Sequence, residues 1–108
     1  MKIFIRDELL TVLGHVRHNY RGIFDHGFGH FAVGSIRYYV AKCVIRKLDG
    51  LFCDLLEMDF SKSYEDFVVS FLSIRTEYVK LYQVISAQHL LGLLDLKAIY
   101  SVPRKLNL

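Results

Sequence analysis

The sequence predicts an α+β domain with an N-terminal helix, a three-stranded antiparallel β-meander and C-terminal helices. Apolar residues recur at helical spacing in the first and last thirds of the chain, whereas β-branched and aromatic residues crowd the middle third. Within that third, Asp49-Gly50 separates two such runs, a pattern typical of a tight hairpin. An all-α bundle with one helix over residues 31–58 is the alternative, because short apolar runs fit either period.

A single domain is expected to span residues 1–108. Of these residues 53% are hydrophobic and only one is proline, which suits one ordered core without a long linker. The basic segment 101–108 is expected to fray. Asp7 and Glu8 fall where an export signal needs apolar residues, and the longest uncharged stretch, residues 81–94, is shorter than the about 20 residues that cross a bilayer. We therefore expect a cytoplasmic protein without a membrane segment.

A short strand over residues 2–6 is expected to lead into a helix that begins at Asp7 and ends at Gly22. Aspartate is a favoured N-cap residue, and glycine often follows the last helical turn. Between them, apolar residues three and four positions apart define a core-facing stripe: Leu9, Val12, Leu13, Val16 and Tyr20. The same periodicity places His15 and His18 on the opposite, solvent-facing side.

The meander is expected to follow from two tight turns. A two-residue loop at Asp49-Gly50 places Lys42 opposite Glu57 and gathers apolar side chains on one face of the hairpin. A second turn at Gly34-Ser35 adds a strand over residues 28–33. The antiparallel meander is therefore consistent with both the charge pairing and the apolar pattern.

The second face of the meander also carries apolar side chains, which we interpret as a partner-binding interface. Its members are Phe31, Tyr38, Val40, Val44 and Leu48. In this register Cys43 and Cys53 lie on opposite faces, so they are not expected to form a disulfide. Two cysteines without an export signal are expected to be reduced thiols.

The last third of the chain predicts helices. Ser63 with Asp66 three residues later resembles an N-terminal capping pair. A helical stripe follows it: Phe67, Phe71, Ile74, Tyr78, Leu81 and Ile85. Ser86 is expected to cap a further short helix over residues 87–96.

Charge is segregated along the chain. Residues 10–48 hold six cations and one acid, a formal sum of +5, and residues 49–66 hold six acids and one cation, a sum of −5. In the predicted hairpin these blocks lie side by side and pair across the strands. Arg17 and Arg21 are left as the uncompensated cations, beside the histidines.

Histidines cluster in the stretch "HVRHNYRGIFDHGFGH". His15, His18 and His26 could supply three zinc ligands, whereas His30 is expected to lie on a strand away from them. The spacing matches no diagnostic metal motif. Solvated surface histidines are the simpler interpretation, so we expect no cofactor, with zinc as the alternative.

The element "RGIFDH", Arg21 to His26, resembles the Arg-x4-His element of HEPN ribonucleases. The resemblance covers six residues. It implies an all-helical bundle in which an arginine and a histidine act on the 2′-hydroxyl and phosphate of RNA. On this likeness, Arg21 and His26 would carry the chemistry.

The segment "HGFGHFAV" is similar to the basic-Gly-aromatic-Gly segment of RNA-recognition motifs, and "KIFIRDEL" is similar to the first strand of that family. The resemblance implies that Phe28 and His30 offer stacking surfaces to bases. Together with the basic positions Arg17, His18 and Arg21 and with His26, they form a candidate nucleic-acid surface.

The apolar surplus favours a non-enzymatic role. The mean hydropathy is +0.27. A chain this apolar has more apolar surface than a domain of this size usually buries in its own core. The sequence therefore predicts a small protein-interaction or inhibitory module that acts through an apolar sheet or helix surface, as a homodimer or with a protein partner. The alternative is a nucleic-acid-binding protein or minimal ribonuclease that uses the Arg17/Arg21/His face. The wealth of Phe, Tyr, Ile and Lys suggests a virus or mobile element, which would place the protein in the host cytoplasm or nucleus.

Overall fold

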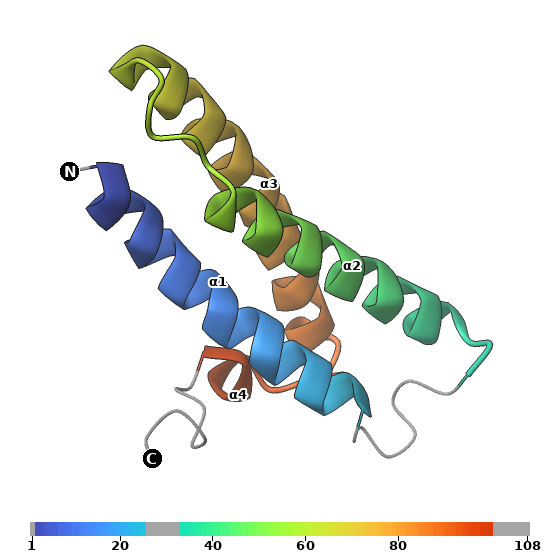
Figure 1. Ribbon diagram of the computed structural model, residues 1–108. Coiled ribbons are helices and arrows are strands. Elements are labelled where there is room, and N and C mark those ends of the chain that lie inside the picture. The colour runs from blue at the N-terminus through green and yellow to red at the C-terminus, as the bar shows by residue number, and fades with distance from the viewer. Residues whose placement is uncertain (1, 26–32, 101–108) are drawn as a thin grey trace.

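The computed structural model describes residues 2–25 and 33–100, and these residues form four helices and no strand. In chain order the helices are α1 (Lys2–Asp25), α2 (Ile36–Leu56), α3 (Tyr64–Leu90) and α4 (Leu96–Tyr100). In Figure 1, α1 and α2 run antiparallel, α3 crosses behind α2, and the short α4 lies beneath the C-terminal half of α1. The predicted α+β fold with a three-stranded meander is wrong, and the all-α alternative holds for the described residues.

Helix α2 occupies the segment for which the hairpin was predicted. Its buried residues recur at spacings of three and four, which is the helical period and not the period of two that a strand requires: Ala41, Val44, Leu48, Leu51 and Leu55. Asp49 and Gly50 lie inside this helix and make no turn. A glycine inside a helix costs about 1 kcal/mol relative to alanine, and burial of this apolar stripe outweighs that cost.

Helix α1 begins at Lys2, so the segment "KIFIR" is its first turn and a half and not a strand. Gly22 lies inside the helix, which continues to Asp25. Two side chains fasten this end of α1 to the last turn of α2 and to the segment after it. The Lys2 ammonium donates to the carbonyl of Lys62 over 2.8 Å, and Arg6 donates to the carbonyl of Leu55 over 2.9 Å.

Serine side chains cap the N-terminal ends of α2 and α3. Ser35 accepts a hydrogen bond from the backbone N–H of Tyr38 over 3.1 Å, directly after Gly34, whose positive φ of 88° favours glycine. The predicted cap at Ser63 is confirmed, since its hydroxyl accepts from the N–H of Asp66 over 3.2 Å. The predicted cap at Ser86 is wrong, because Ser86 lies within α3.

The core lies where α1, α2 and α3 meet. The side chains of Leu13, Leu48 and Ile85 are fully buried, one from each of these helices. Tyr20 is also buried, and its hydroxyl donates to Oε1 of the buried Gln88 over 3.0 Å. Burial raises the pKa of Tyr20 to about 12, although the bond to Gln88 acts against the rise. One polar pair is thus satisfied within an otherwise apolar core.

Helix α4 closes the lower end of the core. It has only five residues, and Ile99, its one buried residue, is fully covered. The side-chain amide of Asn19 in α1 donates to the carbonyl of Ile99 over 2.8 Å. The hydroxyls of Tyr78 and Tyr100 lie 3.3 Å apart and tie α4 to α3. Burial raises the pKa of both phenols.

Among residues 2–25 and 33–100, no helix is both long enough and apolar enough to span a bilayer. The tail 101–108, for which fraying was expected, lies outside the described residues.

Candidate interaction surface

An open groove runs between α2 and α3 and is lined by residues of these helices and of the turn after α3. Two adjoining hollows of ≈ 320 Å³ and ≈ 360 Å³ share Ile36, Val40 and Val84. The first hollow is completed by Tyr39, Cys43, Val44, Lys47 and Leu81. The second is completed by Arg37, Ala87, Gln88, Leu91 and Leu93. We call this surface the α2–α3 groove.

Large apolar side chains of the α2–α3 groove are open to solvent. Ile36 is 83% exposed, Leu91 74% and Tyr39 60%, and Val40 and Val84 are still 37% and 38% exposed. Covering apolar surface is favourable by about 25 cal/mol for each Å² removed from water. Contiguous exposed apolar surface of this kind is typical of a binding site.

The groove exists because α2 carries a second apolar stripe beside its core stripe. Ile36, Val40 and Cys43 follow one another at spacings of four and three, which keeps them on one side of the helix. That side turns toward α3, where Val84 and Leu91 stand seven residues apart, two turns along one face. The stripe was not recognised in the sequence, because residues 36–48 were interpreted with the strand period.

The groove becomes charged toward the far end of α2. A third hollow of ≈ 230 Å³ lies against Leu51 and Leu81 and has a charged rim: Lys47, Asp54, Glu77 and Lys80. Lys80 donates to Glu77 over 3.2 Å within α3. The groove therefore has an apolar half and a charged half.

Both arginines of the predicted basic face form ion pairs with Asp49. Arg17 donates to one carboxylate oxygen of Asp49 over 2.6 Å, and Arg21 donates to the other over 2.5 Å. Arg17 also lies over the ring of Phe52, 4.8 Å from its centroid. The expectation that both arginines are uncompensated is wrong, because the helical α2 turns Asp49 toward α1.

Asp49→Asn is expected to lower the free energy of unfolding by about 1 kcal/mol near neutral pH. All three charged side chains are more than a third exposed, so solvent screens the cluster. Partial burial alone would raise the pKa of Asp49, but the hydrogen bonds and charges of Arg17 and Arg21 lower it below 3.8. The contribution is therefore complete above pH 3.8 and is lost as the pH falls through the lower pKa of the folded state.

Urea unfolding of the Asp49→Asn variant at several pH values measures this contribution. Glu8→Gln is the matched control, since Glu8 is exposed on α1 and has no ion-pair partner in the described part of the chain. An equal loss of stability in both variants would show that the arginine pair contributes nothing specific.

Only part of the predicted metal and nucleic-acid site can be placed. His15 is half-buried and His18 is exposed on α1, whereas His26, Phe28 and His30 lie outside the described residues. Within residues 2–25 and 33–100, no group of three His, Cys, Asp or Glu side chains could hold a metal ion. The segment "KIFIR", which was likened to the first strand of RNA-recognition motifs, is helical, so this part of the resemblance is wrong.

Comparison with known protein families, with curated proteins and with solved structures finds no match. What the chain does must therefore be argued from its own residues and their geometry.

The residues of the predicted interface do not form one surface in the structure. Val44 and Leu48 are 3% and 0% exposed and belong to the core, because they face α1 and α3 and not solvent. Tyr38 is half-buried and packs against Phe24, with ring centroids 5.4 Å apart. Val40 lines the α2–α3 groove with an exposed side chain, and the buried Val44 also lines its first hollow. Phe31 lies outside the described residues.

The two cysteines lie ten residues apart on α2, and both thiols are exposed and free. Ten residues of a helix span about 15 Å, which is too far for a disulfide. The predicted lack of a disulfide agrees with this geometry, although the hairpin register given as its reason is wrong.

Proposed function

We propose that this chain is a small non-enzymatic protein-interaction module that binds a helical segment of a partner in the α2–α3 groove. The observation that carries the proposal is the exposure of Ile36, Tyr39 and Leu91 around two adjoining hollows. A groove between two helices is a common acceptor for an amphipathic helix, whose apolar residues fill successive hollows. The module acts in the cytoplasm, and it serves as an inhibitor where the bound helix is needed by another protein.

The charges beside the groove indicate the character of that helix. Arg37 lines one apolar hollow and Lys47 lines the other, and the groove half between Ile36 and Val44 carries no acid. A partner helix with acidic residues beside its apolar stripe complements this rim and is favoured over a basic one.

Site-specific photocrosslinking in cells that express this protein tests the proposal. A photoreactive side chain at position 84, within the groove, is expected to crosslink to a partner protein, because Val84 lines all three hollows. Thr11, exposed on α1, is the control position. An added Val40→Asp substitution should abolish the crosslink from position 84, because it places a charge in the apolar half. A crosslink at position 84 that survives Val40→Asp, or the same products from position 11, would contradict the proposal.

A second candidate function is nucleic-acid binding or RNA cleavage on the face of Arg17 and Arg21. Two observations favour it: the described fold is all-helical, as the likeness to HEPN ribonucleases implies, and Gly22 does not interrupt the helix that carries Arg21. Asp49 opposes it, because its carboxylate neutralises part of the charge that a phosphate would meet. One carboxylate stands against two guanidinium groups, so this face keeps a net positive charge.

Binding of a labelled single-stranded RNA at increasing salt concentration tests the second candidate. If Arg17 and Arg21 contact phosphates, replacing both with alanine reduces the slope of log affinity against log salt by about 0.7 for each lost contact. Asp49→Asn should strengthen binding by releasing both guanidinium groups. The same salt dependence in all variants would exclude this face.

A further inference from the structure

The charges of α2 and its C-cap residue are separated by sign. Residues 36–48 carry four cations and no acid, and residues 49–57 carry three acids and no cation. The cations are Arg37, Lys42, Arg46 and Lys47, and the acids are Asp49, Asp54 and Glu57. This order opposes the helix dipole, which favours anions near the N-terminus and cations near the C-terminus. Arginines of α1 offset part of the cost: Arg6 donates to the carbonyls of Leu55 and Leu56 at the end of α2, and Arg17 and Arg21 pair with Asp49.

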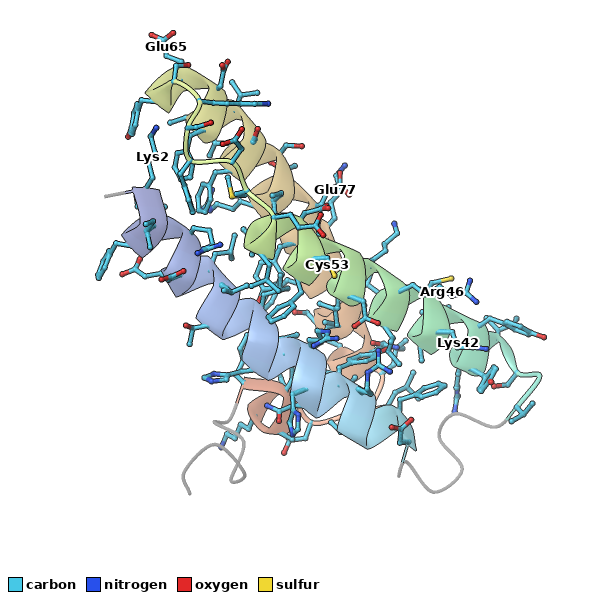
Figure 2. The ribbon with its side chains drawn as sticks, in the orientation of Figure 1. Lys2, Lys42, Arg46, Cys53, Glu65 and Glu77 are labelled. Atoms are coloured by element: carbon cyan, nitrogen blue, oxygen red, sulfur yellow. The ribbon has the colours of Figure 1, made fainter. Side chains whose placement is uncertain are left out.

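Helix α3 does not offset the remainder. In Figure 2, Lys42 and Arg46 lie toward one end of the molecule, whereas Glu65 of α3 lies at the other end. Glu65 and Asp66, in the first turn of α3, therefore stand at the same end as the acidic half of α2. Among the described residues, Arg46, Lys47, Asp54 and Glu57 have no ion-pair partner. Of the acids of α2, only Asp49 is paired.

Gly50 lies where the sign changes. It is exposed, and a Cβ built on it would meet no atom within 4 Å. Arg46 stands four residues before Gly50 and Asp54 four residues after it, so all three lie along one side of the helix. A second helix that runs antiparallel across Gly50 can approach closely, because no side chain separates the two backbones.

We propose that a second copy of this chain docks antiparallel on the outward face of α2, about a two-fold axis at Gly50. Arg46 of each copy then faces Asp54 of the other, and Lys42 of each lies near Glu57 of the other. Each copy supplies both signs of charge, as an isologous interface requires. Gly50 and Asp54 line the charged half of the α2–α3 groove, whereas the apolar hollow beside Leu91 and Leu93 lies at the other end of α2 and stays open to another partner. The proposal therefore does not rest on the proposed function.

Charge reversal tests the pairing directly. Arg46→Glu or Asp54→Arg alone places like charges together twice in each dimer, and each is expected to weaken dimerisation by about tenfold or more. The double variant R46E/D54R restores opposite charges across the axis and should return the dissociation constant to near that of the unmodified chain. Arg75→Glu, an exposed reversal on α3, is the matched control and should change nothing. Sedimentation equilibrium at micromolar concentration gives each dissociation constant.

Cysteine crosslinking at the axis gives a second measurement. In a Cys43→Ser/Cys53→Ser background, Gly50→Cys places one thiol of each copy at the two-fold axis, so mild oxidation should yield a covalent dimer. Thr76→Cys in the same background should not. A monomeric chain under these conditions, a dimer unaffected by either single reversal, or a double variant that stays dissociated would overturn the proposal. Leu91→Asp should leave the dissociation constant unchanged, because Leu91 lines the apolar hollow that contains neither Gly50 nor Asp54, and this separates the dimer interface from the apolar half of the groove.

Discussion

Leu48→Ala is expected to lower the free energy of unfolding by about 3 kcal/mol. The side chain of Leu48 is fully buried among residues of the core cluster, so its removal leaves a cavity that the surrounding helices fill only in part. In the predicted meander the same residue would face a partner and its truncation would change stability little. Urea unfolding followed by far-ultraviolet circular dichroism measures the difference.

Leu90→Ala is the matched control for Leu48→Ala. It removes the same atoms from a residue that is 84% exposed near the end of α3. Substitutions at such positions usually change stability by less than about 0.5 kcal/mol. If both variants unfolded at the same urea concentration as the unmodified chain, Leu48 would not be a core residue and α2 would be packed on another face.

Tyr20→Phe is expected to lower the free energy of unfolding by about 2 kcal/mol. The substitution keeps the ring but removes the hydroxyl that donates to Gln88, which is 5% exposed. The amide oxygen of Gln88 then loses its donor in a nearly anhydrous environment. The double variant Tyr20→Phe/Gln88→Leu removes both polar groups and should recover part of the loss. A double variant that is less stable than the sum of the single variants would contradict this account.

The same tyrosine makes stability depend on alkaline pH. Its pKa rises from 10.0 to about 12 on folding, because burial disfavours the phenolate. The folded state therefore prefers the neutral phenol. The contribution of this preference to the free energy of unfolding is complete below pH 10 and is lost as the pH rises from about 10 to about 12. Unfolding experiments between pH 9 and pH 12 should show this loss, and Tyr20→Phe should make the decline shallower.

The core-facing stripes of the outer thirds could be predicted because the helical period explains them, whereas the strand over residues 2–6, the helix end at Gly22 and the cap at Ser86 were wrong. Leu13, Val16 and Tyr20 of the first predicted stripe are buried, and Phe67, Leu81 and Ile85 of the last are buried as well. The cap at Ser63 was found from two residues alone. The residues of both stripes recur at spacings of three and four, which is the helical period. The agreement is incomplete, since Val12 of the first stripe is 41% exposed.

The middle third was predicted wrongly because α2 has apolar residues on two sides. Stripes facing the core and facing α3 together leave few polar positions, and a sequence of this kind fits alternation as well as it fits the helical period. The Asp49-Gly50 dipeptide then favoured the prediction of a hairpin turn. Its carboxylate is instead held by Arg17 and Arg21, which lie 32 and 28 residues earlier in the chain. Contacts at such separations depend on the packing of α1 against α2, which local sequence patterns do not encode.

The position of α4 has a consequence for how the chain is synthesised. Ile99 completes the core and its carbonyl accepts from Asn19, eighty residues earlier. Chains leave the ribosome N-terminus first, at about 5–20 residues per second. Helices α1 and α2 are therefore available to pair while the segment that seals them is still inside the ribosome. Until α4 emerges, the nascent bundle is expected to expose the apolar surface that Ile99 covers in the folded chain.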